Sequence, residues 1–140
     1  MTADLIAFLQ ARLDEDEAAA RAATAGPWVE SGVGDHGWGV SFSAPGSGVE
    51  ADDGSQGRAD AAHIARHDPA RALAEVEAKR RVVGECAYWN ERMEAEAVNP
   101  PKFPQPGLDL GLLLDAMNPI LRHLAAPYAD HPDYREEWRP

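Results

Sequence analysis

Apolar residues repeat at three- and four-residue intervals near the start of the chain. The stripe consists of Leu5, Phe8, Leu9 and Leu13. This spacing predicts an amphipathic helix over residues 3–23, with Thr2 as its N-cap. Gly26-Pro27 is expected to end it, because neither residue favours a helix interior. Residues 1–26 therefore form the first segment of the predicted fold.

The hydrophobic pattern changes to a period of two after this helix. The clearest strand carries apolar side chains at every second position, namely Trp38, Val40 and Phe42. Turn-forming residues at 34–35 and 45–48 separate it from shorter apolar pieces on either side. We therefore predict a two- or three-stranded antiparallel meander over about residues 28–53, within a segment spanning 27–57.

Two helices are predicted between residues 58 and 98. A short one covers 59–67, capped near Gly57-Arg58, and a long one runs from Pro69 to about Ala97. The Asp68-Pro69 dipeptide separates them, because proline cannot continue the first helix while aspartate can cap the second. The apolar side of the long helix comprises Leu73, Val76, Val83, Cys86, Trp89 and Met93.

The last third of the chain begins with a proline-rich stretch from Asn99 to Gly107, which we expect to be an extended crossover. Residues 108–140 then form C-terminal helices and a tail. A leucine-rich helix is predicted over 108–117, and Asn118-Pro119 should restart it at a new angle through Leu124. The tail is expected to pack on the body through its aromatic residues, Tyr128, Tyr134 and Trp138.

These elements predict a mostly helical α+β fold, with an N-terminal helix, a small antiparallel meander and three to four further helices. A length of 140 residues suits one domain, so we expect residues 1–140 to form a single one. The core should be modest, because much of the 44% apolar content is alanine and only 7% of residues are aromatic.

The net charge of the chain makes some classes of binding partner unfavourable. The formal net charge is −11, which repels phosphate backbones and disfavours nucleic-acid binding. We expect no secretory signal, because the first residues lack a basic start and an unbroken apolar run, and no apolar run approaches the ~18–20 residues that span a bilayer. We expect a cytoplasmic protein with no membrane partner, whose acidic surface either engages another protein or simply keeps the chain in solution.

No residue set predicts catalysis or binding of an organic cofactor. The single cysteine, Cys86, falls on an apolar helical face and is expected to be a buried small hydrophobe. No serine sits in the G-x-S-x-G frame of a nucleophile elbow. The glycines between 32 and 39 lack the lysine and helix of a phosphate loop. The sequence therefore does not favour an enzyme.

One constellation suggests a metal site. His63 and His67 are four residues apart, which puts both imidazoles on one helical face. Zinc or another divalent metal would need further ligands, for which His131 and Asp133 of the tail are the candidates, with Asp60 and Asp68 as others. The favoured alternative is structural: His67 packs at the helix junction, His63 lies on the surface, and His131 belongs to a turn.

Several segments together carry a family resemblance. Residues 22–28 (AATAGPW), 60–71, 75–80 and 128–140 resemble an actinobacterial family of short uncharacterised proteins. The AT-x-GPW … DA-x-x-IA frame is more distantly similar to small accessory proteins of phages and prophages. The resemblance implies a setting rather than a mechanism. Many members carry a cysteine- and histidine-bearing insert after the long helix, where this chain has Asn99 to Gly107.

Two functions follow from the sequence. The leading one is a non-enzymatic acidic module that binds another protein or a second copy of itself, in a mobile-element or host-regulatory setting. The alternative is a metal-binding protein or metal-dependent enzyme that uses the His63/His67 pair.

Overall fold

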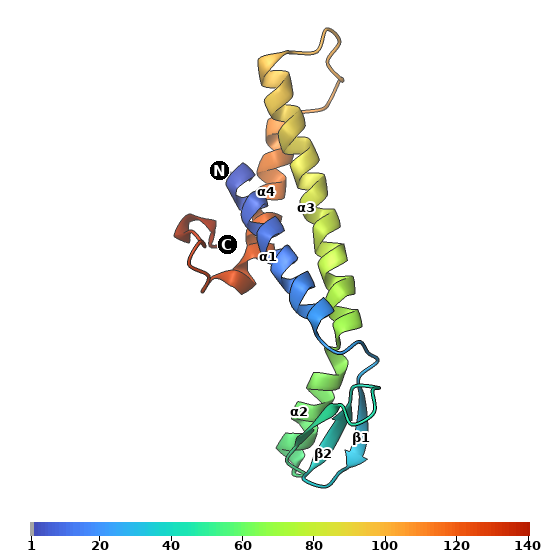
Figure 1. Cartoon of the computed structure of the whole chain (residues 1–140). Coiled ribbons are helices and arrows are strands. Elements are labelled where there is room, and N and C mark those ends of the chain that lie inside the picture. The colour runs from blue at the N-terminus through green and yellow to red at the C-terminus, as the bar shows by residue number, and fades with distance from the viewer. Residues whose placement is uncertain (1) are drawn as a thin grey trace. The chain divides into compact units, whose positions relative to one another are not determined.

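The computed structural model describes residues 2–140 and confirms the mostly helical α+β class (Figure 1). Its elements are α1 (Thr2–Ala22), β1 (Val29–Val33), β2 (Trp38–Ser41), β3 (Gly48–Ala51), α2 (Ser55–Arg66), α3 (Pro69–Val98), α4 (Leu110–Ala125), η1 (Ala126–Tyr128) and η2 (Glu136–Trp138). Thr2 lies within α1 rather than capping it, and α1 ends four residues before Gly26. Along residues 2–140 no helix is both long and apolar enough to cross a membrane.

The chain divides into two compact units, which we describe separately. The helical unit comprises residues 2–14 and 78–140, and the sheet unit comprises Glu15–Glu77. The helices α1 and α3 each contribute a part to both units.

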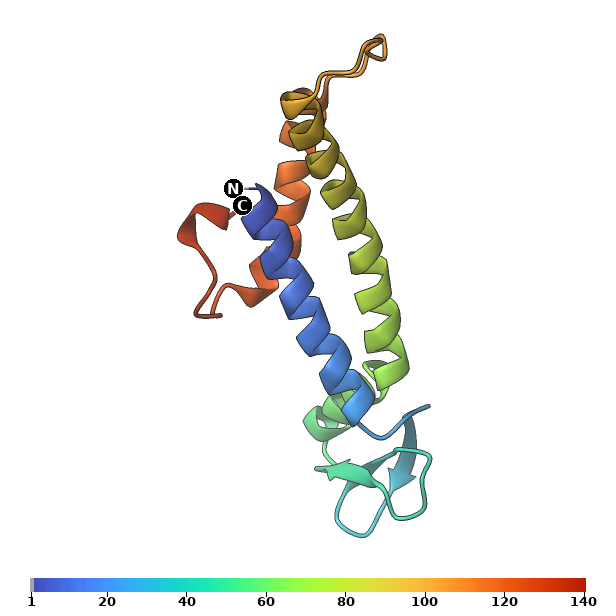
Figure 2. The ribbon, with the colours of Figure 1, turned by 45° about the horizontal axis from the view of Figure 1, so that its top comes forward.

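The helical unit is built on the apolar stripe predicted at the start of α1. Leu5, Leu9 and Leu13 are almost completely buried. The matching buried side chains are Val83 and Cys86 of α3 and Leu114, Leu121 and Ala125 of α4. In both ribbon views this part of α1 lies alongside α4 and the C-terminal part of α3 (Figures 1 and 2).

The predicted break at Asn118-Pro119 is wrong, because α4 is one continuous helix that contains Pro119. Leu114, Leu121 and Ala125 recur at seven- and four-residue spacing and are all buried, so a single helix axis buries them together. The ring of Pro119 is exposed, where loss of one backbone hydrogen bond is tolerated best. The helix starts at Leu110, where the side chain of Asp109 accepts a hydrogen bond from the backbone N–H of Leu112 at 3.0 Å.

The tail is ordered, as predicted, and Phe8 of α1 is the residue that orders it. The ring of Phe8 contacts four tail rings, with centroid distances of 6.3 Å to Tyr128, 5.7 Å to His131, 5.9 Å to Tyr134 and 5.0 Å to Trp138. Polar contacts support the same packing: Arg12 Nη1 donates to His131 Nδ1 at 2.8 Å, and Arg135 pairs with Asp4 at 2.8 Å. The proline-rich crossover before α4 has no helix or strand, also as predicted.

We predict that Phe8→Ala destabilises the helical unit by about 3–5 kcal/mol, because it opens a cavity and removes the centre of the aromatic cluster. Urea unfolding followed by near-ultraviolet circular dichroism measures this change. Phe103→Ala is the control, because Phe103 is 89% exposed whereas Phe8 is 6% exposed. Equal midpoints for Phe8→Ala and wild type would contradict the role given to Phe8.

The sheet unit contains the antiparallel meander, in the order β1-β2-β3. Trp38 and Val40 occupy one face, against which α2 packs, and Val40 is 2% exposed. The guanidinium of Arg58 on α2 lies over the ring of Trp38 at 4.3 Å. Next to the strands, Trp28 stacks on Phe42 with centroids 4.0 Å apart. A small sheet needs such a covering helix to be stable.

The start of α2 differs from the prediction, because the helix begins at Ser55 with Gly54 as N-cap rather than near Gly57-Arg58. Gly57 is instead a buried residue inside the helix, where a Cβ would collide with the backbone of Asp52. Glycine here lets the first turn of α2 approach the end of β3 closely.

Asp68 caps α3, as predicted, and also holds the segment that leads into β1. Its Oδ1 accepts a hydrogen bond from the backbone N–H of Arg71 at 2.9 Å. Its Oδ2 accepts one from the backbone N–H of Trp28 at 3.4 Å. One carboxylate therefore joins two stretches that are 40 residues apart in sequence.

We predict that Asp68→Ala costs about 1–2 kcal/mol of stability, because it removes the cap. Asp68→Asn keeps an oxygen for Arg71 but loses one acceptor, so it separates the cap from the contact with Trp28. Thermal unfolding should rank the proteins as wild type, Asn variant, Ala variant in decreasing stability. An alanine variant as stable as wild type would contradict this account.

Candidate binding site on the open face of the sheet

The predicted histidine pair is present on α2. His63 and His67 are both exposed, and their ring centroids are 4.2 Å apart. Nδ1 of His67 lies 2.9 Å from the carbonyl oxygen of His63. Because a carbonyl can only accept, Nδ1 is the donor in this contact, and Nε2 is the ring nitrogen that the contact does not use.

The predicted tail ligands belong to the other unit and have other partners. His131 and Asp133 lie in the helical unit. Nδ1 of His131 faces two donors, Arg12 Nη1 at 2.8 Å and the backbone N–H of Asp133 at 3.1 Å. Within the described chain, 2–140, no three His, Cys, Asp or Glu side chains gather as a metal site requires.

Cys86 is unsuited to nucleophilic chemistry. The side chain is buried in the helical unit, and this burial raises the pKa of the thiol above its ordinary value, with Glu85 raising it further. The reactive form of cysteine is the thiolate, which a raised pKa makes scarcer.

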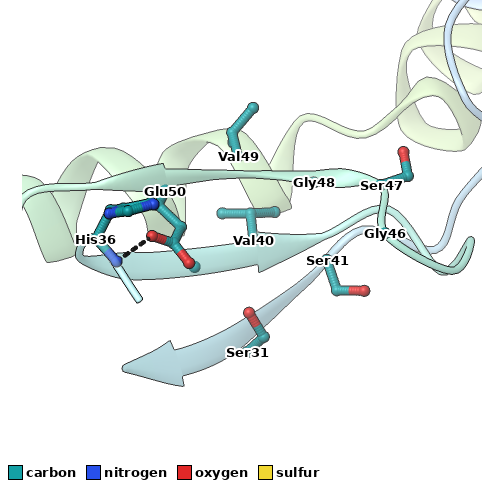
Figure 3. A pocket seen from close by; sticks show the side chains of 10 residues that line it. Ser31, His36, Val40, Ser41, Gly46, Ser47, Gly48, Val49 and Glu50 are labelled. Carbon is teal, nitrogen blue, oxygen red and sulfur yellow. Dashed lines mark hydrogen bonds between the residues drawn. The ribbon is translucent and has the colours of Figure 1, made fainter. Parts of the chain in front are cut away.

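A hollow of about 630 Å³ lies on the sheet itself (Figure 3). Trp38 and Val40 occupy the face towards α2, so Gly39 and Ser41 occupy the opposite one, which we call the open face. The hollow is lined mainly by hydroxyl-bearing residues and glycines of the strands and turns, with one imidazole and one carboxylate. They include Ser31, His36, Gly39, Ser41, Ser47, Gly48 and Glu50, and the valines Val40 and Val49 also border the hollow.

The carboxylate of Glu50 is held in place at one end of this hollow. Its Oε2 accepts a hydrogen bond from the backbone N–H of His36 at 2.7 Å, the dashed line in Figure 3. Gly34 gives the carboxylate room, because a Cβ at that position would collide with it. Among the described residues, no lysine or arginine lines the hollow. The site therefore offers a fixed negative charge beside hydroxyl groups, a combination that suits a ligand carrying a cation and hydrogen-bond donors.

The sheet unit around the hollow is negatively charged, like the carboxylate of Glu50. Glu15–Glu77 contains twelve acidic and four basic side chains, so the sheet unit carries a net −8 of the chain's −11. Asp35 directly precedes His36, whose N–H binds Glu50, and Asp52 and Asp53 directly follow β3. Of these, Asp53 forms an ion pair with Arg58 at 2.7 Å.

None of the residues predicted to form a site lines this hollow. The signal was present in the alternation of Gly39 and Ser41 with Trp38, Val40 and Phe42, which marks one face of β2 as small and polar. Glu50 lies eight residues beyond this pattern, and its proximity to His36 depends on strand pairing, which the sequence does not display.

A family model described as "Family of unknown function (DUF6221)" covers residues 2–140. No curated protein and no solved structure matches the chain.

Proposed function

The chain belongs to the Family of unknown function (DUF6221), and from the chemistry of its own surface we propose that it is a protein-binding module whose sheet unit engages a basic partner. The observation that carries the proposal is the net −8 of Glu15–Glu77, together with the fixed carboxylate of Glu50 in the hollow. A field of one sign steers an oppositely charged partner and speeds its association.

The chemistry of the open face favours a polar and reversible interface. Hydroxyl groups, an imidazole and backbone groups next to glycines can hydrogen-bond to a partner directly or through water. The lining contains few large apolar side chains, which supply most of the affinity in permanent interfaces. We therefore assign this surface to a transient complex, as expected of an accessory module in a mobile-element or host-regulatory setting.

The partner is a different protein rather than a second copy of the chain. If two sheet units faced each other, two units that each carry a net charge of −8 would come together. Like charges placed opposite one another in an interface cost several kcal/mol. A lysine- or arginine-rich segment has the complementary charge.

We predict that a lysine-rich synthetic peptide binds the protein and that binding weakens about tenfold or more between roughly 20 and 200 mM salt. The double variant Glu50→Gln/Asp52→Asn should weaken it about three- to tenfold at low salt, because it removes two charges at the site. Isothermal titration calorimetry measures both effects.

The matched control removes two exposed acidic groups from the helical unit, Glu91→Gln/Asp115→Asn. It changes the net charge equally but should leave the affinity within about twofold of wild type. Equal losses in the two double variants would show that only overall charge matters. Absence of peptide binding at low salt would refute the proposal.

A second candidate function is metal binding by His63 and His67, the alternative raised by the sequence. The observation that favours it is the contact between His67 Nδ1 and the carbonyl of His63, which leaves Nε2 of His67 able to ligate. In metal sites, a histidine commonly donates a hydrogen bond from the ring nitrogen that does not bind the metal, and this bond orients the ring. Two imidazoles provide half of a tetrahedral zinc shell, so water or a partner molecule would complete it.

For this candidate we predict that zinc binds with one ion per chain, and that His63→Ala lowers the affinity at least about tenfold. His123→Ala is the control, because His123 is an exposed histidine on α4 in the helical unit. Calorimetric titration with zinc chloride provides the measurement. Uptake that is equally strong in both variants, or absent from wild type, would exclude the pair as a site.

A further inference from the structure

We propose that β3 is a docking edge, to which an extended basic segment of the partner adds as a fourth, antiparallel or parallel, strand. This inference rests on the proposed function, and it specifies which part of the sheet unit the partner touches and what conformation the partner adopts. Strand addition is a recurrent way in which proteins bind extended peptides, because the backbone supplies hydrogen bonds and alternate side chains supply specificity.

The two outer strands of the sheet differ in how well they could accept another strand. In β1 the pairing with β2 is irregular, because the register shifts between Glu30 and Gly32. A bulge of this kind twists an edge and discourages further pairing. In contrast, β3 pairs with β2 in unbroken register from Gly48 to Ala51. The regular edge is therefore that of β3.

The backbone groups that β3 directs outward can be identified from the pairing. Phe42 donates its N–H to the carbonyl of Ser47 at 3.1 Å, which makes this a hydrogen-bonded pair. Hydrogen-bonded and non-bonded pairs alternate along an antiparallel ladder, so Val49 and Ala51 direct their groups to β2. The N–H and C=O groups of Gly48 and Glu50 consequently point away from the sheet. Among residues 2–140, no turn or loop forms a backbone hydrogen bond with these outward groups.

The side chains of β3 define what an incoming strand should carry. Glu50 lies on the open face, and a directly opposed residue has its Cβ about 4.5–5.5 Å from that of Glu50. A lysine or arginine there reaches the carboxylate, and Asp52 adds negative charge beyond the end of the strand. Val49 lies on the other face and is 41% exposed, so an apolar residue fits opposite it. The matching segment alternates basic and apolar residues.

The test uses the full chain and a synthetic peptide of alternating lysine and valine. Amide hydrogen exchange, followed by nuclear magnetic resonance, should show that the peptide slows exchange at Gly48 and Glu50 at least about tenfold. The amides of Val49 and Ala51 should change little, because they are already bonded to β2. A peptide of alternating lysine and proline has the same charge but cannot form a ladder, and it should bind at least about tenfold more weakly.

The outcomes separate this inference from the proposed function. Equal affinity for both peptides, without slowed exchange at Gly48 and Glu50, would overturn the docking edge and leave an acidic binding surface standing. Failure of both peptides to bind at low salt would overturn the proposed function together with the edge. Slowed exchange at Val33 of β1 instead of at Gly48 and Glu50 would place the added strand on the other edge and refute the assignment to β3.

Discussion

The position of the sheet in its unit depends on two hydrogen bonds that the carboxylate of Asp68 accepts. This carboxylate satisfies one of the free N–H groups at the start of α3 and, through its second oxygen, the N–H of Trp28 just before β1. A sheet of three short strands buries too little surface to be stable alone, so its position must be set by what it packs on and what holds its ends. Here α2 supplies the packing, and Asp68 with the Trp28–Phe42 stack secures the chain where the meander begins.

The open face of the sheet is small and polar because the sheet has few large side chains. The apolar residues of β2 are used against α2, which leaves glycine and serine for the opposite face. Small residues allow the turns to close tightly, and they also leave a hollow into which another molecule can fit. Glu50 is fixed over this hollow because the turn before β2 donates a backbone N–H to it. The features that make the sheet compact therefore also create its candidate binding surface.

The sequence predicted the features that depend on local pattern. The stripe of Leu5, Leu9 and Leu13, the cap at Asp68-Pro69 and the ordering of the tail through Trp138 follow from helical spacing, capping chemistry and the placement of aromatic residues. Other features depend on contacts between distant residues and escaped prediction. The local pattern predicts a helix boundary at Gly57, whereas this glycine allows close approach to Asp52 inside the helix. The local pattern predicts a break at Pro119, whereas burial on both sides of it keeps α4 continuous.

A regular strand edge exposed to solvent is hazardous, because it can pair with a second copy of the same edge. In β3, negatively charged side chains oppose the pairing of two copies. Pairing two such edges would bring Glu50 and Asp52 of one copy towards those of the other, and like charges opposite one another destabilise a ladder. The same carboxylates attract a strand that carries lysine or arginine. Repulsion of the wrong partner and attraction of the right one thus come from one set of side chains, which is how specificity arises when the backbone itself makes no distinction between strands.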